Sequence, residues 1–168
     1  MKILKSFNQI NKIIDRNNKK LVFFSGTFDL FHYGHFSALN KAAKLGDILL
    51  VQVDSNKLVK IRKGKDRPIL DEQYRAQIIS SLNFVNYVFI SDKPSENSLK
   101  LLVIKPDIFI RAILPNESDD DRAAREKKLK SYMPHGKIVW LAQTPQISTT
   151  KIIQGLNYSQ EESIIKVL

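Results

Sequence analysis

The chain has 168 residues, 43% of them hydrophobic, and contains no cysteine. This length and apolar content predict a folded chain with an ordinary buried core, and the absence of cysteine excludes disulfides and thiolate zinc sites. The 27 Lys and Arg outnumber the 17 Asp and Glu, and the formal charge of +10 favours anionic partners such as nucleotides, sugar phosphates, nucleic acid or an acidic membrane face.

Residues 1–20 combine basic side chains with apolar positions at helical spacing. The apolar positions are Ile3, Leu4, Phe7, Ile10, Ile13 and Ile14, and the basic ones are Lys2, Lys5, Lys12, Arg16, Lys19 and Lys20. This pattern favours an amphipathic basic helix that packs on the core over a helix that binds a membrane or RNA. The sequence has no signal-peptide pattern and no stretch of about 20 apolar residues, so we expect a cytoplasmic, soluble protein without membrane contact.

The rest of the chain alternates between strand-like and helix-like runs. We expect strands over residues 21–25, 47–53, 87–91, 107–111 and 137–141, and helices over 34–45, 71–82, 95–104 and 118–132 and from Ser148. Asp71 is an expected N-cap, and the helix over 118–132 has acidic residues first and lysines last, which suits the helix dipole. Apolar strands separated by helices predict one α/β domain, a Rossmann-like doubly wound sheet of about five parallel strands with helices on both faces.

Two of the three histidines flank a glycine directly after the first apolar strand. Gly26 permits a tight turn, and Gly34 lets a phosphate approach the start of the next helix. His32 and His35 are three residues apart, so at helical pitch both face one pocket. Because ligands of such sheets bind beyond the carboxyl ends of the strands, this segment predicts a nucleotide-phosphate site. Two histidines without a third ligand do not favour zinc.

A second polar segment follows the last predicted strand. The hydroxyls of Ser148, Thr149 and Thr150 can cap a helix and bind phosphate oxygens, and Lys151 adds a positive charge. In isolation such a segment is more often only a cap. Its place after a strand, beside the histidine segment, favours a role in phosphate binding.

With these two segments the sequence resembles the cytidylyltransferase-like nucleotidyltransferases, which share a Rossmann-like fold with class I tRNA synthetases. The family pattern of Gly-Thr-Phe-Asp and then His-x-Gly-His is similar to Gly26-Thr27-Phe28-Asp29 and His32-Tyr33-Gly34-His35, and its closing Ile-Ser-Thr-Thr to Ile147-Ser148-Thr149-Thr150. Between them, residues 43–47, 59–64, 67–68 and 74–76 are similar to the sugar-phosphate adenylyltransferases exemplified by D-glycero-β-D-manno-heptose 1-phosphate adenylyltransferase, which also have a basic N-terminal helix. The resemblance covers nearly the whole chain.

The resemblance implies a single nucleotidyltransferase domain over residues 1–168, with the basic helix over 1–20 and the catalytic core over 21–168. It implies transfer of AMP from ATP to a small phosphorylated sugar or polyol, with release of pyrophosphate. Catalysis would consist mainly of positioning and charge neutralisation. Mg²⁺ would come with the nucleotide, because it prefers phosphate oxygens to an all-protein cage.

The resemblance also implies roles for individual residues. His32, His35 and Lys63 would be catalytic, and Lys63 and Arg67 would close over the phosphates from a mobile loop spanning residues 60–67. The expected nucleotide-binding residues are Gly26, Thr27, Phe28, His32, Gly34, His35, Arg111, Ser148, Thr149 and Thr150, and the expected acceptor-binding residues are Asp29, Lys63, Arg67 and Arg75. Three alternatives remain open: a solvated basic loop, an exposed ion pair at Arg75, and an Asp29 that only fixes its turn.

Two segments depart from the family pattern. Residues 111–116 replace a Gly-Gly-Asp loop with Arg-Ala-Ile-Leu-Pro-Asn, which points to a changed acceptor pocket or a weakened enzyme. Residues 143–146 lack the arginine and glycine of related cytidylyltransferases, which disfavours CTP.

Other functions therefore remain alternatives to the adenylyltransferase. They are a CTP-dependent cytidylyltransferase of the glycerol-phosphate type, phosphopantetheine or flavin-nucleotide versions, and a nucleotide-binding pseudoenzyme or regulator. The charge of +10 and the kinship with tRNA synthetases raise RNA binding, but without an anticodon module nucleic acid is not an expected partner. Family members are often homodimers, although the residues themselves reveal no dimer seam.

Overall fold

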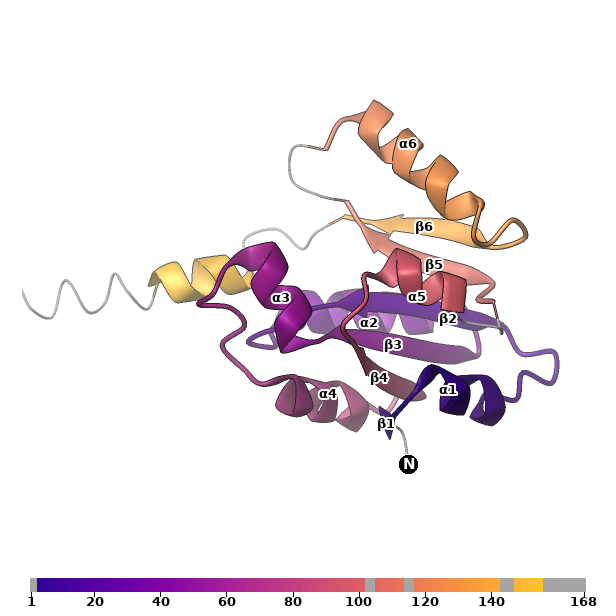
Figure 1. The fold of residues 1–168 in the computed structure, drawn as a ribbon, viewed down its shortest axis with the longest axis horizontal. Helices are drawn as coiled ribbons and strands as arrows, with labels where there is room; N and C mark the ends of the chain where they lie inside the picture. Colours follow the sequence, from indigo (N-terminus) through magenta and orange to yellow (C-terminus); the bar gives the residue numbers. More distant parts are fainter. Residues whose placement is uncertain (1–2, 102–104, 114–116, 143–146, 156–168) are drawn as a thin grey trace, which may run out of the picture.

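The fold is a parallel sheet of six strands in the order β1-β4-β3-β2-β5-β6 (Figure 1). A computed structural model of the protein describes residues 3–101, 105–113, 117–142 and 147–155. The strands are β1 (Ile3–Leu4), β2 (Leu21–Gly26), β3 (Ile48–Asp54), β4 (Tyr87–Ser91), β5 (Ile108–Ala112) and β6 (Lys137–Leu141), and every neighbouring pair is parallel. The predicted α/β class and Rossmann-like parallel sheet are confirmed.

Helices cover both faces of this sheet. They are α1 (Phe7–Ile13), α2 (Tyr33–Ala43), α3 (Asn56–Lys63), α4 (Glu72–Ser81), α5 (Ser95–Leu101) and α6 (Asp119–Lys130), and residues 149–155 are also helical. One core cluster takes side chains from α1, α5 and α6, and the other from α2 and α4. Among the described residues, no helix combines the length and apolar character needed to cross a membrane.

Strand β2 supplies both core clusters because successive side chains of a strand point to opposite faces. Leu21 and Phe23 belong to the cluster under α1, α5 and α6, whereas Val22 and Phe24 belong to the cluster under α2 and α4. The fully buried ring of Phe23 stacks on Phe109 of β5 at 5.2 Å and on Phe89 of β4 at 6.1 Å. These apolar runs explain why the strands could be predicted from the sequence.

The order of the strands reverses beside β2. The chain runs from β2 to β3 and β4 on one side, and then returns to place β5 on the other side of β2. The connections that follow β2 and β5 therefore leave in opposite directions and open a crevice at the carboxyl ends of these strands.

The N-terminal segment differs from the predicted helix over residues 1–20. Ile3 and Leu4 form β1, a strand in addition to the five predicted ones, and pair with Val88 and Phe89 of β4. The helix extends only from Phe7 to Ile13. Leu4 is buried in the core. The pairing uses the open edge of β4, a long-range contact that helical spacing does not reveal.

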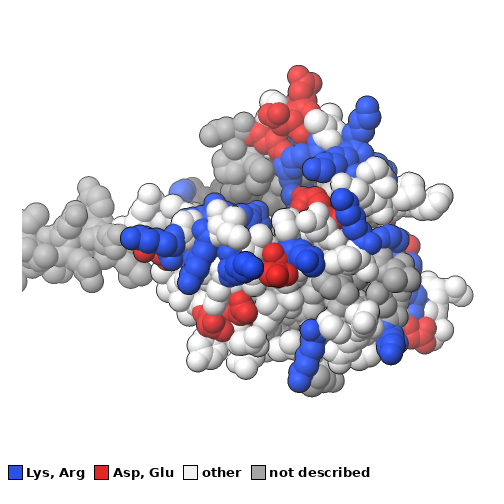
Figure 2. Space-filling model, viewed as in Figure 1, with Lys and Arg blue, Asp and Glu red and all other residues white. Residues whose placement is uncertain are grey.

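The segment after β3 also differs from the prediction. The first four residues of the predicted loop over residues 60–67 belong to helix α3. Ser55 caps this helix by accepting a hydrogen bond from Leu58 N, and Leu58 and Val59 are buried. Lys63 is therefore the last residue of a helix, and the loop starts at Gly64. Figure 2 shows basic side chains gathered over α3 and acidic ones over the start of α6.

Replacing Phe23 by Ala should lower the free energy of unfolding by about 3–5 kcal/mol, because it removes a buried ring between two others. The control is Ile61→Ala on α3, where the side chain is 74% exposed and a change within about 0.5 kcal/mol is expected. Urea unfolding of both variants measures the difference. Equal losses would contradict the central place of Phe23.

Candidate active site

A cavity of about 570 Å³ lies beyond the carboxyl ends of β2 and β5, at the point where the strand order reverses. The start of α2, the end of α3 and residues 147–150 complete its walls. It is lined by these residues that the sequence predicted for the site: Gly26, Thr27, Phe28, Asp29, His32, Gly34, His35, Lys63, Arg67, Ser148, Thr149 and Thr150. Of the predicted residues only Arg75 and Arg111 lie elsewhere.

The turn after β2 has a strained backbone. Phe28 and Leu30 have φ angles of 53° and 45°, a left-handed conformation that costs a residue other than glycine on the order of 1–3 kcal/mol. The ring of Phe28 is buried and packs edge-on against Phe24 and His35. A Cβ atom on Gly26 would lie 2.9 Å from this ring, so the packing requires glycine there.

Asp29 holds this turn from inside. Its carboxylate, 1% exposed, accepts hydrogen bonds from Arg67 Nε at 3.0 Å, Ile69 N at 3.0 Å and Leu70 N at 2.9 Å. Burial alone would raise the pKa of Asp29, but these hydrogen bonds and the charge of Arg67 outweigh it and lower the pKa. The structure thus gives this ionised carboxylate a structural role, as in the alternative that Asp29 fixes its turn, while its contact with the acceptor stays a prediction.

The two histidines stack at the start of α2. Their ring centroids are 3.8 Å apart, and Nδ1 of His32 accepts a hydrogen bond from Gly34 N at 3.1 Å. This bond leaves the proton of neutral His32 on Nε2. A Cβ atom on Gly34 would lie 3.0 Å from the His32 ring, so glycine at this position allows the histidine to cap the helix.

Both histidines are neutral near pH 7. Burial lowers the pKa of His32, and burial together with the neighbouring His32 and Lys63 lowers the pKa of His35 to about 3. Nδ1 of His35 is buried and has no hydrogen-bond partner among the described residues. Each ring therefore offers one N–H donor to a ligand and no positive charge.

Lys63 supplies positive charge to the cavity. Arg62, the residue before it, pairs with the buried carboxylate of Asp54 at 2.9 Å, whereas Lys63 lines the cavity. Burial, with the nearby charges of Arg67 and Arg62, lowers the pKa of Lys63. Arg67 also lines the cavity, but its guanidinium pairs with Asp29. Among the described residues Lys63 forms no ion pair, which leaves its charge available to an anion.

Residues 148–150, the hydroxyl segment, both cap a helix and line the cavity. Ser148 Oγ accepts a hydrogen bond from Lys151 N at 3.2 Å, and Thr149 Oγ1 donates to the carbonyl oxygen of Asp29 at 2.8 Å. Thr149 thereby joins this segment to the strained turn. Ser148 and Thr150 face the same space as the histidines.

Arg75 does not reach the cavity, so its predicted contact with the acceptor is wrong. The side chain is fully buried and donates to the carbonyl oxygens of Leu70, Thr27 and Asp54 and to Asn56 Oδ1, at 2.6–2.9 Å. It is not an exposed ion pair either. A guanidinium with so many protein acceptors connects the turn after β2, the end of β3 and the start of α4.

Arg111 was also predicted wrongly, because it points to the opposite face of the sheet. Its guanidinium donates to Ser95 Oγ at 2.7 Å, pairs with Glu96 at 3.0 Å and covers the ring of Phe109. Ala112, the next residue of β5, lines the cavity in its place. Two segments depart from the family pattern. Residues 114–116 of the first segment and all of the second, residues 143–146, lie outside the described residues.

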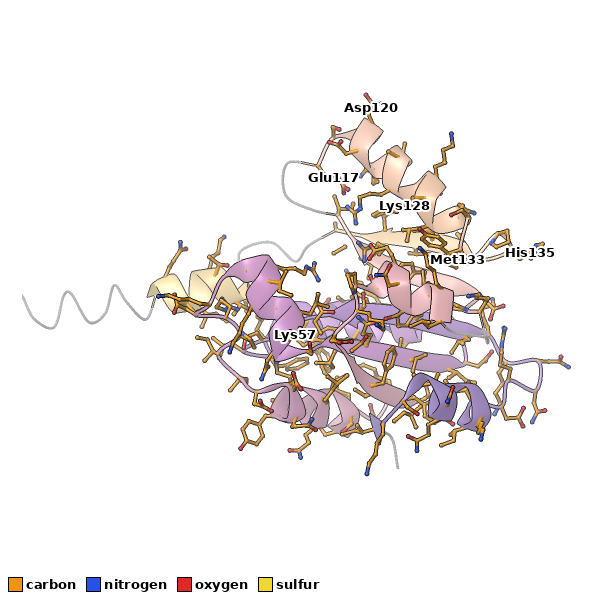
Figure 3. All side chains as sticks on the ribbon, in the orientation of Figure 1. Lys57, Glu117, Asp120, Lys128, Met133 and His135 are labelled. Atoms are coloured by element: carbon orange, nitrogen blue, oxygen red, sulfur yellow. The ribbon has the colours of Figure 1, made fainter. Side chains whose placement is uncertain are left out.

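Sequence reasoning missed several residues that line the cavity, including one face of α2. Ser37, Ala38 and Lys41 follow Gly34 by three, four and seven residues on α2 and line the cavity. Helical periodicity from Gly34 was the signal that could have found them. The third histidine, His135, precedes β6 at the other end of the sheet (Figure 3). Within the described residues, no group of three His, Asp or Glu could hold a metal ion.

Replacing Arg75 by Met should destabilise the protein by about 3–5 kcal/mol, because buried carbonyl groups lose their donor and nearby buried carboxylates lose a compensating charge. The same change at Arg122, which pairs with Asp119 on the surface of α6, should cost less than about 1 kcal/mol. Chemical denaturation compares the two. Similar losses would contradict the structural role of Arg75.

The low pKa of His35 predicts a stability that falls in acid. Between pH 3 and 6.5 the unfolded chain binds more protons at this residue than the folded one, so stability rises with pH across that window. From pH 7 to pH 5 the wild-type protein should lose about 1 kcal/mol more than His35→Gln, allowing for partial exposure of the ring. Thermal unfolding at both pH values measures this; equal losses would place the pKa of His35 near its ordinary value.

The chain is similar in sequence to curated proteins. The chain is 39% identical over 110 residues to the bifunctional protein HldE of Campylobacter jejuni subsp. jejuni serotype O:2, covering 66% of this chain and 24% of that protein. It is 34% identical over 158 residues to the bifunctional protein HldE of Desulfatibacillum aliphaticivorans, covering 93% and 31%. The chain thus spans less than a third of the length of these relatives.

Solved structures share the fold. The lipopolysaccharide core biosynthesis protein of Thermoplasma volcanium GSS1 superposes with a TM-score of 0.61 at 27% identity, over 75% of this chain and 98% of that one. Pantoate-beta-alanine ligase of Francisella tularensis, at 17% identity, shares the fold with a TM-score of 0.58 over 87% of this chain and 68% of that one. The profile of one family, cytidylyltransferase-like, matches residues 23–155, from β2 to the helix after the hydroxyl segment, and the chain belongs to that family.

Proposed function

We propose that the chain is a nucleotidyltransferase that transfers AMP from ATP to the phosphate of a small phosphorylated sugar or polyol and releases pyrophosphate. The main observation behind the proposal is that a single cavity gathers the stacked histidines, Lys63 and the hydroxyls of Ser148 and Thr150 at the reversal of the strand order. Membership of the cytidylyltransferase-like family supports the same reaction class.

The reaction needs no nucleophile from the protein. An oxygen of the acceptor phosphate attacks the α-phosphorus of ATP in line, the bond from this phosphorus to the bridging oxygen breaks, and pyrophosphate leaves with that oxygen. The protein has to hold two polyanions together and neutralise charge on the transferred group. His32 and His35 would donate N–H groups to the phosphates, and Lys63 would supply the positive charge.

The neutral histidines suit a site that binds a polyanion. A bound triphosphate raises the pKa of nearby imidazole and ammonium groups, because negative charge favours their protonated forms. Burial lowers the pKa of Lys63, and phosphates beside it would raise this pKa again and favour its charged form. The positive charge of the cavity would therefore be largest when the substrates are bound.

Mg²⁺ would enter with the triphosphate. This ion prefers phosphate oxygens with one or two carboxylates, and when bound it would neutralise charge on the departing pyrophosphate. The carboxylate of Asp29, which lines the cavity, already accepts hydrogen bonds from Arg67, Ile69 and Leu70. These contacts fit an ion held mainly by the nucleotide.

ATP is proposed over CTP because of the resemblance to sugar-phosphate adenylyltransferases and the missing arginine before Ile147. A wall of small and apolar side chains, with Ala112, Leu141, Ala142 and Ile147, offers a surface for the base. A CTP-dependent enzyme remains the second candidate, since this apolar wall does not distinguish the two bases.

Turnover tests the proposal directly. The protein is incubated with Mg²⁺, ATP or CTP, and heptose 1-phosphate, glucose 1-phosphate or glycerol 3-phosphate, and released pyrophosphate is measured. We expect pyrophosphate with ATP and a sugar 1-phosphate. Turnover only with CTP would identify a cytidylyltransferase, and nucleotide binding without turnover would identify a pseudoenzyme.

Replacing His35 by Ala should lower kcat by about 100- to 1,000-fold, as for the loss of one donor to a developing charge. The matched control is His135→Ala, at the opposite end of the sheet, which should keep the wild-type kcat. Melting temperatures of both variants are measured alongside. Parallel loss of kcat and folded protein in His35→Ala would point to a structural histidine instead.

A further inference from the structure

Asp29 connects three parts of the cavity that are distant in the sequence. It lies in the strained turn between Phe28 and Leu30, its carboxylate binds the 67–70 loop through Arg67 and two backbone N–H groups, and its carbonyl oxygen accepts the hydroxyl of Thr149. Asp29 is only 1% exposed, so these contacts take place inside the protein. Two of the residues that Asp29 contacts, Arg67 and Thr149, line the cavity.

The strained backbone on both sides of Asp29 needs such support. Left-handed residues other than glycine persist only where the surrounding structure determines their conformation. The packed ring of Phe28 provides one constraint and the hydrogen bonds of Asp29 provide the others. Without the carboxylate, the turn, the loop and the hydroxyl segment would each lose a contact that places it relative to the others.

The charge of Asp29 is unfavourable for a site that binds anions, which makes its presence informative. An ionised carboxylate on the wall of a phosphate cavity repels the ligand by Coulomb's law. The same carboxylate orients the guanidinium of Arg67, with Nε and Nη2 both directed at Oδ2. Asp29 can improve the binding of an anion only if its ordering of Arg67 contributes more free energy than its repulsion of the anion costs.

We propose that Asp29 is a positioning residue of the transferase site, which holds Arg67 and the hydroxyl segment at the spacing that the phosphates require. The inference rests on the proposed function, since it concerns the phosphates of a nucleotide. It assigns Asp29 no contact with either substrate. Arg67 pairs with Asp29 through Nε and Nη2, and in this orientation it would offer the rest of its guanidinium to an anion in the cavity.

Asp29→Asn separates positioning from simple electrostatics through the sign of its effect. The substitution removes a negative charge from the cavity, so electrostatics alone predicts tighter ATP binding. Positioning predicts the opposite, with ATP affinity about tenfold lower after loss of a charged hydrogen bond. It also predicts that kcat falls about 100-fold, because misplaced phosphates react slowly.

The chain offers a matched control at the other end of the same strands. Asp107, directly before β5, pairs with Arg16 and accepts a hydrogen bond from Leu21 N at 2.7 Å. Asp107→Asn therefore removes an ion pair and weakens a backbone contact without touching the cavity. It should lower the melting temperature and leave ATP affinity and kcat as in the wild type.

The experiment compares the wild type, Asp29→Asn and Asp107→Asn by calorimetric titration with ATP and Mg²⁺, at a temperature where all three are folded. ATP affinity in Asp29→Asn equal to or higher than in the wild type would overturn the proposal. A double variant with Arg67→Ala adds a second readout. If Asp29 acts through Arg67, the double variant should lose less affinity than the sum of the single losses.

Amide hydrogen exchange keeps this inference separate from the proposed function. The amides of Ile69 and Leu70, which donate to Asp29, should exchange faster in Asp29→Asn and not in Asp107→Asn, whether or not a nucleotide is present. If the wild type binds neither ATP nor CTP, the proposed function fails. Unchanged exchange at both amides would still overturn the role of Asp29 by itself.

Discussion

The reversal of strand order beside β2 is the constraint on which the rest of the structure depends. Because β3 and β5 flank β2 on opposite sides, no single connection closes the carboxyl ends of β2 and β5. The chain fills this edge with short segments instead: the strained turn after β2, the end of α3 and residues 147–150. Each of them contributes polar groups to one cavity, and none of them is long enough to hold its shape alone.

Charge in and around the cavity is divided between groups that shape it and groups that remain available. Arg75 and Asp29 are buried and use their charges on backbone and side-chain partners from several elements. The histidines are held neutral by burial. Lys63 is left with a charge that no described partner neutralises. The charges at the site depend on individual contacts of this kind, so the charge of +10 is a poor guide to the site itself.

The sequence predicted what depends on local order along the chain. The apolar strands, Asp71 as an N-cap and the two segments that line the cavity all rest on patterns of a few neighbouring residues. The failures depend on long-range contacts. Strand β1 exists because β4 has an open edge, Arg111 turns away because of the strand register, and Arg75 finds its acceptors only after three segments meet. Helix α3 is too short for its periodicity to stand out against its five basic and polar residues.

The register of β5 also bears on whether the departure from the family pattern weakens the site. In the sequence, Arg111 and Ala112 begin the segment that stands where the resemblance implies a Gly-Gly-Asp loop near base and acceptor, and the added bulk favoured the pseudoenzyme alternative. In the fold the larger side chain faces α5, where Ser95 and Glu96 bind it, and only the methyl group of Ala112 faces the cavity. The bulk of Arg111 therefore takes no space from a nucleotide. At residues 111 and 112 the departure removes backbone freedom and leaves the cavity open, which weakens the case for a regulator without turnover.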